Sequence, residues 1–154
     1  MASSTYHTIA VQGPGSRKEG LADVAITPGE LLRFKSDGDL EPHGTAGGVL
    51  ASKLVALESQ TPDSESAASI DVDYAIGETV YYAVGRPGEV YYMWLKAGET
   101  AVKGITQLVS DGAGALQAET VDASTLANSV VGVPAESYDN SGGGSRVRLL
   151  VEIV

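Results

Sequence analysis

The sequence contains no cysteine, so disulfide bonds and thiolate metal sites are excluded. It also has no apolar run approaching the roughly 20 residues that cross a bilayer, and we expect no membrane partner. The first residues, Met1 to Thr8, are polar and lack the apolar centre of a signal peptide. We therefore expect synthesis in a cytoplasm without export by a classical signal.

Basic residues are scarce. The chain has 10 lysines and arginines against 20 aspartates and glutamates, a net charge of -10. The phosphate backbone of nucleic acids attracts clustered lysine and arginine, and no basic run with interleaved aromatic residues occurs here. We expect no direct contact with nucleic acid. The acidic charge also favours solubility.

The sequence lacks a recognisable catalytic pattern, including the G-x-S-x-G and G-x-G-x-x-G motifs. The two histidines, His7 and His43, have no carboxylate and hydroxyl in a recognisable order nearby, and we expect both in exposed loops. Asp71 and Asp73 would face the same way on a strand, as a cation site or an acid–base pair requires. Beside Tyr74, however, the pair is more typical of a solvated strand start. We predict no catalytic residue, no metal, no cofactor and no enzymatic activity.

A turn followed by a strand recurs along the chain. Gly-Glu occurs at Gly29-Glu30, Gly77-Glu78, Gly88-Glu89 and Gly98-Glu99. Glycine supplies turn conformations that other residues reach only with strain, and the residues after each pair favour extended backbone. Between Ile70 and Val109 these turns come about every ten residues, which is typical of small sandwiches and barrels. We predict an all-β fold in which any helix is short.

The length favours one domain, which we place at residues 21–154, preceded by an N-terminal arm at residues 1–20. The arm has too many charges and breakers after Gln12 to join a core. Its β-prone part, with Tyr6, Ile9 and Val11, is suited to adding a strand to a partner's sheet edge. We expect the arm to be mobile in the free protein and its deletion to leave the domain folded.

The segment from Val49 to Leu57 is open to two interpretations. Val49, Leu50, Leu54 and Leu57 have helical spacing, whereas residues 54–57 alone fit a buried strand.

Five aromatic residues lie close together in two predicted strands: Tyr81, Tyr82, Tyr91, Tyr92 and Trp94. Neighbours in each tyrosine pair should face opposite sides of a sheet. One interpretation is a core with a surrounding girdle of cross-strand aromatic pairs. A second is a protein interface, where tyrosine and tryptophan are enriched. A third is a face that stacks on sugars.

Taken in order, several short motifs resemble the head decoration, or capsid cement, proteins of tailed bacteriophages. These motifs cover most of the chain from about residue 17: residues 17–20 (RKEG), 26–31 (ITPGEL), 36–38 (SDG), 55–58 (VALE), 70–80 (IDVDYAIGETV), 86–90 (RPGEV), 103–104 (KG) and 131–136 (VGVPAE). Each motif is weak alone, and the ordered set is more specific. Residues 6–11 carry no motif of the family.

The resemblance implies a small β-barrel or β-tulip-like domain, commonly a homotrimer, on the outer surface of the capsid. Such proteins clamp neighbouring subunits of the major capsid protein against the internal pressure of DNA. Two other classes stay open. One is a carbohydrate- or receptor-binding β-module, and the other is an enzyme of a β-clip type with a pocket of converging polar groups.

Overall fold

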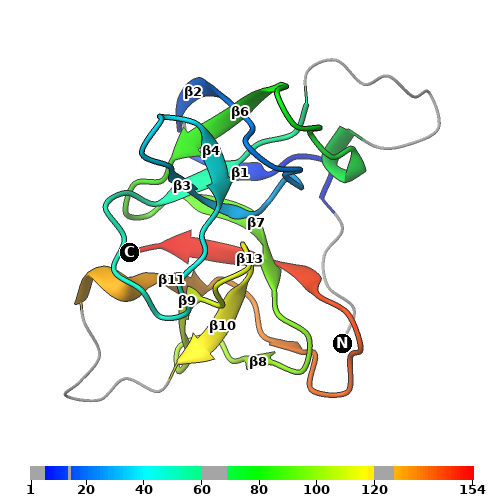
Figure 1. Ribbon diagram of the computed structural model, residues 1–154. Helices are drawn as coiled ribbons and strands as arrows, with labels where there is room; N and C mark the ends of the chain where they lie inside the picture. The colour runs from blue at the N-terminus through cyan, green and yellow to red at the C-terminus, as the bar shows by residue number, and fades with distance from the viewer. Residues whose placement is uncertain (1–5, 14, 60–68, 120–126) are drawn as a thin grey trace.

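The computed structural model describes residues 6–13, 15–59, 69–119 and 127–154, and short strands dominate these residues (Figure 1). The strands are β1 (Ala10–Gln12), β2 (Ser16–Leu21), β3 (Leu31–Phe34), β4 (Leu40–Pro42), β5 (Leu54–Ala56), β6 (Thr79–Val84), β7 (Val90–Leu95), β8 (Thr100–Ala101), β9 (Gln107–Ser110), β10 (Leu116–Glu119), β11 (Val130–Pro134), β12 (Tyr138–Asp139) and β13 (Val147–Ile153). Within these residues the helical elements are two 3-10 turns, η1 (Ser69–Asp71) and η2 (Ala127–Ser129). The all-β prediction is confirmed.

Five strands close into a barrel in the order β7, β10, β9, β11, β13, with β13 pairing back onto β7. The β7–β13 ladder is the longest, from Val147 opposite Leu95 to Glu152 opposite Val90. The contact between β7 and β10 is parallel and consists of Leu95 opposite Leu116. Strand β1 extends this sheet by pairing with the other end of β7. Because β7 is shared by three neighbours, it is buried along nearly its whole length.

A second sheet, in the order β2, β6, β5, β3, β4, lies beside the barrel, in the upper half of Figure 1. A bridge between Ala22 and Leu40 joins its two edges and curls it. Successive residues of its strands face opposite cores, as the two-residue period of a strand requires. Leu31 and Val55 pack with the barrel, whereas Leu32 and Leu54 pack inside the curl.

The Gly-Glu turns are built as the sequence predicted, and a strand begins directly after each glutamate. All four glycines have positive φ, from 81° at Gly77 to 92° at Gly29. Such values fit the third position of a type II turn, which residues other than glycine reach only with strain. A β-carbon at position 29 would also lie 2.8 Å from the carbonyl oxygen of Tyr92.

The glutamate explains why the dipeptide recurs. In the turns at residues 27–30, 75–78 and 86–89, the glutamate N–H donates to the carbonyl of the first turn residue at 3.1 Å. Its carboxylate then accepts the N–H of that same residue, at 2.9, 2.7 and 3.0 Å respectively. Each turn is thus closed by two reciprocal hydrogen bonds. In the fourth turn the Glu99 carboxylate instead accepts the Ala118 N–H of β10, at 3.3 Å.

The Glu89 carboxylate accepts more hydrogen bonds than those of the other turn glutamates. Beyond the Arg86 N–H, it accepts the Gly15 N–H at 3.1 Å and the Tyr91 hydroxyl at 2.7 Å. Desolvation is the largest influence and acts to raise the Glu89 pKa, but the hydrogen bonds together outweigh it and leave the pKa lowered. The same environment raises the pKa of Tyr91, through desolvation first and then through its bond to Glu89.

The turn at residues 27–30 fastens the second sheet to the barrel. Trp94 of β7 donates its indole N–H to the Pro28 carbonyl at 2.9 Å. The guanidinium groups of Arg146 and Arg148 lie 4.4 and 4.1 Å from the Trp94 ring centroid. Cations at this distance over a tryptophan ring are attracted by its π-electrons.

The two arginines also hold the turn directly. Arg146 donates to the Glu30 carboxylate at 2.6 Å. Arg148, whose side chain is 8% exposed, donates to the Pro28 carbonyl, the Ile70 carbonyl and the Asp71 carboxylate. Burial is the largest influence on the Glu30 carboxyl and raises its pKa even though Arg146 acts to lower it. We call Trp94, Arg146, Arg148 and the turn at residues 27–30 the inter-sheet joint.

Replacing Glu89 with Gln should lower the free energy of unfolding at pH 7 by about 2 kcal/mol, because three donors lose a charged acceptor. Glu78→Gln, in an exposed turn whose carboxylate accepts the Ala75 N–H, is the matched control and should have a much smaller effect. A depressed pKa in the folded state contributes stability above the unfolded value of 4.5, and that contribution is lost as pH falls through the folded pKa. Melting curves from pH 7 to pH 3 should therefore show the Glu89→Gln deficit shrinking in acid, and a constant deficit would contradict this assignment.

Arg148→Lys should destabilise the protein by about 2 kcal/mol or more, because an ammonium group cannot bridge three acceptors and stack on Trp94 at once. Arg33→Lys is the control, since the Arg33 side chain is 42% exposed and pairs with Glu41 at the surface. Its cost should stay below about 1 kcal/mol. Chemical denaturation measures both variants, and equal losses would show that the joint does not hold the sheets together.

Candidate functional site

The five aromatic residues of the predicted interface face inward or are partly covered. Tyr82, Tyr91 and Tyr92 are buried, and Tyr81 and Trp94 are intermediate. Tyr91 and Tyr92 belong to the barrel core, and Tyr82 to the core of the second sheet. The burial agrees with a core role, but β6 and β7 belong to different sheets, so the cross-strand aromatic pairs of the girdle interpretation do not form between them. None of the chain's seven tyrosines, nor its single tryptophan, is classed as exposed, so none forms an open sugar-stacking face.

The residues of the predicted arm contact the rest of the chain closely. Strand β2 forms a six-residue ladder with β6, from Ser16 opposite Val84 to Leu21 opposite Thr79. A boundary after residue 20 therefore divides β2, and residues 6–13 and 15–20 are not a separate arm in this structure. Residues 1–5 and 14 lie outside the described residues. The expectation that deleting residues 1–20 would spare the fold conflicts with this ladder.

The three residues predicted to bind a partner have different environments. Ile9 is completely buried in the barrel core and its N–H donates to Glu58 at 3.0 Å, so it is not accessible to a partner here. Tyr6 and Val11 are partly buried against the same core, with the Tyr6 ring edge-on to Tyr92 at 5.4 Å. Their contact with a partner stays a prediction.

His43 is not the exposed loop histidine that the sequence predicted; this expectation was wrong. Its side chain is buried because the chain after β4 folds onto the barrel: the His43 N–H donates to Leu31, and the Gly47 N–H to Ser110. Desolvation lowers the His43 pKa, with a further contribution from Arg33. His7 is exposed, as expected.

His43 and Ser110 form a pair that the sequence did not reveal, with 2.8 Å between the imidazole Nδ1 and the hydroxyl Oγ. A histidine beside a serine can activate a nucleophile. The Ser110 hydroxyl is completely buried and also accepts the Gly112 N–H at 3.1 Å, so a substrate carbon cannot reach it in this structure. We interpret the pair as a link between the segment after β4 and the barrel.

The carboxylates singled out in the sequence do not form a site. Asp71 lies in the 3-10 turn η1, not on a strand as expected, and pairs with Arg148, while Asp73 is exposed in the next loop. A different group, Asp23, Asp37 and Asp39, places one oxygen from each within 4.8 Å of the others. The Lys35 ammonium lies 2.7 Å from Asp23 and 3.6 Å from Asp37, so this acidic cluster already has a cation of the chain itself.

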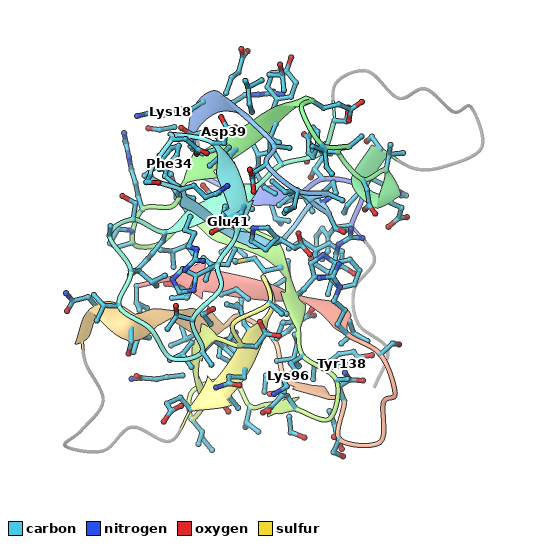
Figure 2. All side chains as sticks on the ribbon, in the orientation of Figure 1. Lys18, Phe34, Asp39, Glu41, Lys96 and Tyr138 are labelled. Atoms are coloured by element: carbon cyan, nitrogen blue, oxygen red, sulfur yellow. The ribbon has the colours of Figure 1, made fainter. Side chains whose placement is uncertain are left out.

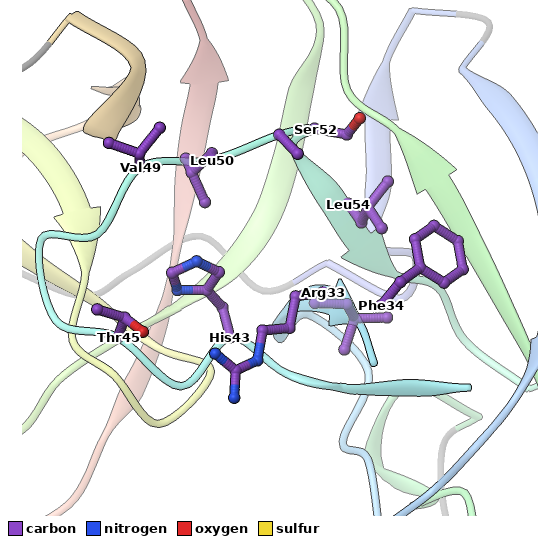
Figure 3. A pocket seen from close by; sticks show the side chains of 10 residues that line it. Arg33, Phe34, His43, Thr45, Val49, Leu50, Ser52 and Leu54 are labelled. Carbon is purple, nitrogen blue, oxygen red and sulfur yellow. The ribbon is translucent and has the colours of Figure 1, made fainter. Parts of the chain in front are cut away.

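A hollow of about 290 Å³ lies between the end of β3 and the segment before β5 (Figure 3). Phe34, which is labelled in Figure 2, and Val49 line it and are 51% and 53% exposed, although both are large apolar side chains. The Phe34 ring meets Tyr82 edge-on at 5.8 Å, which fixes it at the rim. Side chains of Arg33, His43 and Thr45 supply the polar part of the lining.

The hollow has the character of a contact surface. Its lining combines the exposed apolar side chains of Phe34 and Val49 with polar ones such as Thr45 and Ser52, and exposed apolar groups on soluble proteins commonly mark interaction sites. The sequence had left the segment Val49 to Leu57 open between helix and strand. Residues 54–56 form β5, paired with β3 and β6, and the preceding residues form the irregular wall of the hollow. Phe34, the one strongly exposed aromatic residue, was not among the predicted interface residues.

In the described part of the chain, no helix is long and apolar enough to cross a membrane.

No protein-family model matches this chain, and no curated protein matches it. Among solved structures, the chain is similar to the crystal structure of the N base of head fiber gp8.5 in bacteriophage phi29. The TM-score is 0.52 at 14% sequence identity, and the match covers 90% of this chain and 97% of that chain. The likeness shows a shared fold over nearly the whole of both chains.

Proposed function

We propose that the chain is a structural protein of a bacteriophage virion, and more specifically a decoration protein on the capsid. The observation that carries the proposal is the likeness to the N base of a phage head fiber, which extends over 90% of this chain. The ordered sequence motifs resemble phage head decoration proteins, and they do not depend on that structural likeness. Two separate comparisons, of sequence motifs and of fold, thus support a position on a phage head.

The charge supports the outer surface of the capsid as the location. At a net charge of -10 the protein is repelled by packaged DNA, which lines the inside of a filled head. The partner in this proposal is the major capsid protein, and the protein binds as a homotrimer after synthesis in the host cytoplasm. By bridging neighbouring capsid subunits it holds the shell against internal pressure.

We propose no enzymatic role. The one histidine–serine pair found among the described residues has a completely buried hydroxyl. The carbohydrate-binding alternative needs an exposed aromatic face, and each tyrosine and the tryptophan are at least partly covered here. A decoration role requires only a stable body with apolar contact surfaces, which the two packed cores and the exposed Phe34 and Val49 supply.

Co-sedimentation of the purified protein with undecorated shells of the same phage tests the proposal. Binding should saturate at a fixed number of copies per shell and should persist at 0.5 M salt if apolar contacts dominate. Bound protein should raise the temperature at which filled heads release DNA. If the shells sediment with no bound protein at every protein concentration tested, the proposed function is contradicted.

A second measurement asks whether Tyr6 belongs to the capsid contact. Tyr6→Ala should weaken shell binding about tenfold, the size expected for an interface tyrosine. Tyr138→Ala is the matched control, because both tyrosines are partly buried against the barrel core. Melting temperatures of the two variants separate lost binding from lost stability. If the two variants bind equally well, Tyr6 has no part in the contact.

A further inference from the structure

A second hollow adjoins the one in Figure 3, and the segment at residues 50–52 lines both. The second hollow measures about 340 Å³ and opens toward Lys53, Pro87 and the last residue of the chain. Together the two hollows form a continuous uneven surface with Phe34 and Val49 exposed on one side. We call this area the hollow face.

The charged side chains that line the hollow face, Arg33 and Lys53, are basic, and Arg33 is already paired with Glu41 at 2.8 Å. No aspartate or glutamate is among the described residues that line either hollow. The sequence as a whole has twice as many acidic as basic residues. A partner that fits this face therefore combines apolar side chains with neighbouring carboxylates.

A surface of that description exists on the same chain. Leu21, Val24 and Ile76 are 50%, 37% and 72% exposed. They come together because the Gly77 N–H donates to the Ala22 carbonyl at 2.8 Å. Strand pairing also sets Leu21 opposite Thr79.

The exposed residues Asp73 and Glu78 lie beside the same turn, since both line a hollow together with Thr79, which pairs with Leu21. We call Leu21, Val24, Ile76 and these two carboxylates the acidic knob. Ile76 occupies the second position of the turn at residues 75–78, so its side chain projects from the body.

The knob and the hollow face lie on different sides of the molecule. In Figure 1 the turn that leads into β6 is at the top, and the segment between β4 and β5 runs along the left side. One copy therefore cannot cover its own hollow face with its own knob. A second copy can, and its knob brings apolar side chains to Phe34 and Val49 and carboxylates to Arg33 and Lys53.

We propose that the acidic knob of one copy docks in the hollow face of the next copy. Such head-to-tail contact uses two different surfaces on each copy and closes into a ring when the rotation between copies allows. Three copies then form the homotrimer, so this inference rests on the oligomeric part of the proposed function. It does not depend on capsid binding and can be measured without shells.

Ile76→Lys and Val49→Glu test the contact by placing a like charge on each side of it. Both side chains are exposed, so each variant should keep the circular dichroism spectrum of the wild type and lose only the part of the melting temperature that association supplies. Ile105→Lys is the matched control, since Ile105 is 81% exposed on a turn that belongs to neither surface. By analytical ultracentrifugation the wild type and the control should be trimers, and the two test variants should be monomers.

Mixing the two variants gives the sharpest result. The intact knob of the Val49→Glu protein can dock in the intact hollow face of the Ile76→Lys protein, so the mixture should associate although neither component does. A wild type that is monomeric at every concentration, or test variants that remain trimeric, would overturn the inference. A wild type that is monomeric and still binds shells would overturn it while leaving the decoration role intact. A wild-type trimer that fails to bind shells would contradict the decoration role and leave the contact between copies standing.

Discussion

This fold depends most on one interaction: the hydrogen bond by which a glutamate carboxylate accepts a backbone N–H of its own tight turn. A Gly-Glu pair lets one glutamate donate its N–H across the turn and accept the opposing N–H with its side chain. The strand that follows must then leave in a fixed direction, because both ends of the turn are held. Chain reversals of this kind precede β3, β6 and β7, which together link the second sheet to the barrel.

The same turns decide which surfaces remain for partners. Glu30 and the Pro28 carbonyl are engaged by Arg146, Arg148 and Trp94, so the only tryptophan and two of the ten basic residues are committed to joining the sheets. Most of the tyrosine surface lies within the two cores. Among the exposed apolar residues, Phe34 ends a strand, Val49 lies between two strands and Ile76 lies in a turn, so a contact made by these side chains need not disturb the packing of the two cores.

Features that depend on neighbours in sequence could be predicted, and features that depend on distant contacts could not. The Gly-Glu turns, the strands after them and the closing strand follow from local glycine and β-branched preferences. The burial of His43 and Ile9 depends on Ser110 and on β7, which are far along the chain, and both residues looked like loop or arm positions. The strand β5 was ambiguous by spacing alone and is specified by its pairing with β3 and β6.

The candidate interface residues were the hardest to predict, because adjacent tyrosines suggest exposure as readily as burial. A usable signal was the spacing of Arg146 and Arg148, which are two residues apart at the start of a strand. Side chains at this spacing share one face of a strand, and here both guanidinium groups lie over Trp94. The exposure of Phe34 could not be predicted, because a single aromatic residue beside charged neighbours forms no recognisable pattern.

The central claim is that this fold decorates the outside of a phage head. Cryo-electron microscopy of undecorated shells mixed with the purified protein tests it most directly, because it shows position and symmetry in one map. The account predicts density for three copies on the outer surface, centred on three-fold and quasi-three-fold positions of the lattice, with contacts to neighbouring major capsid subunits. Density inside the shell, or shells that stay bare at saturating protein concentration, would contradict it.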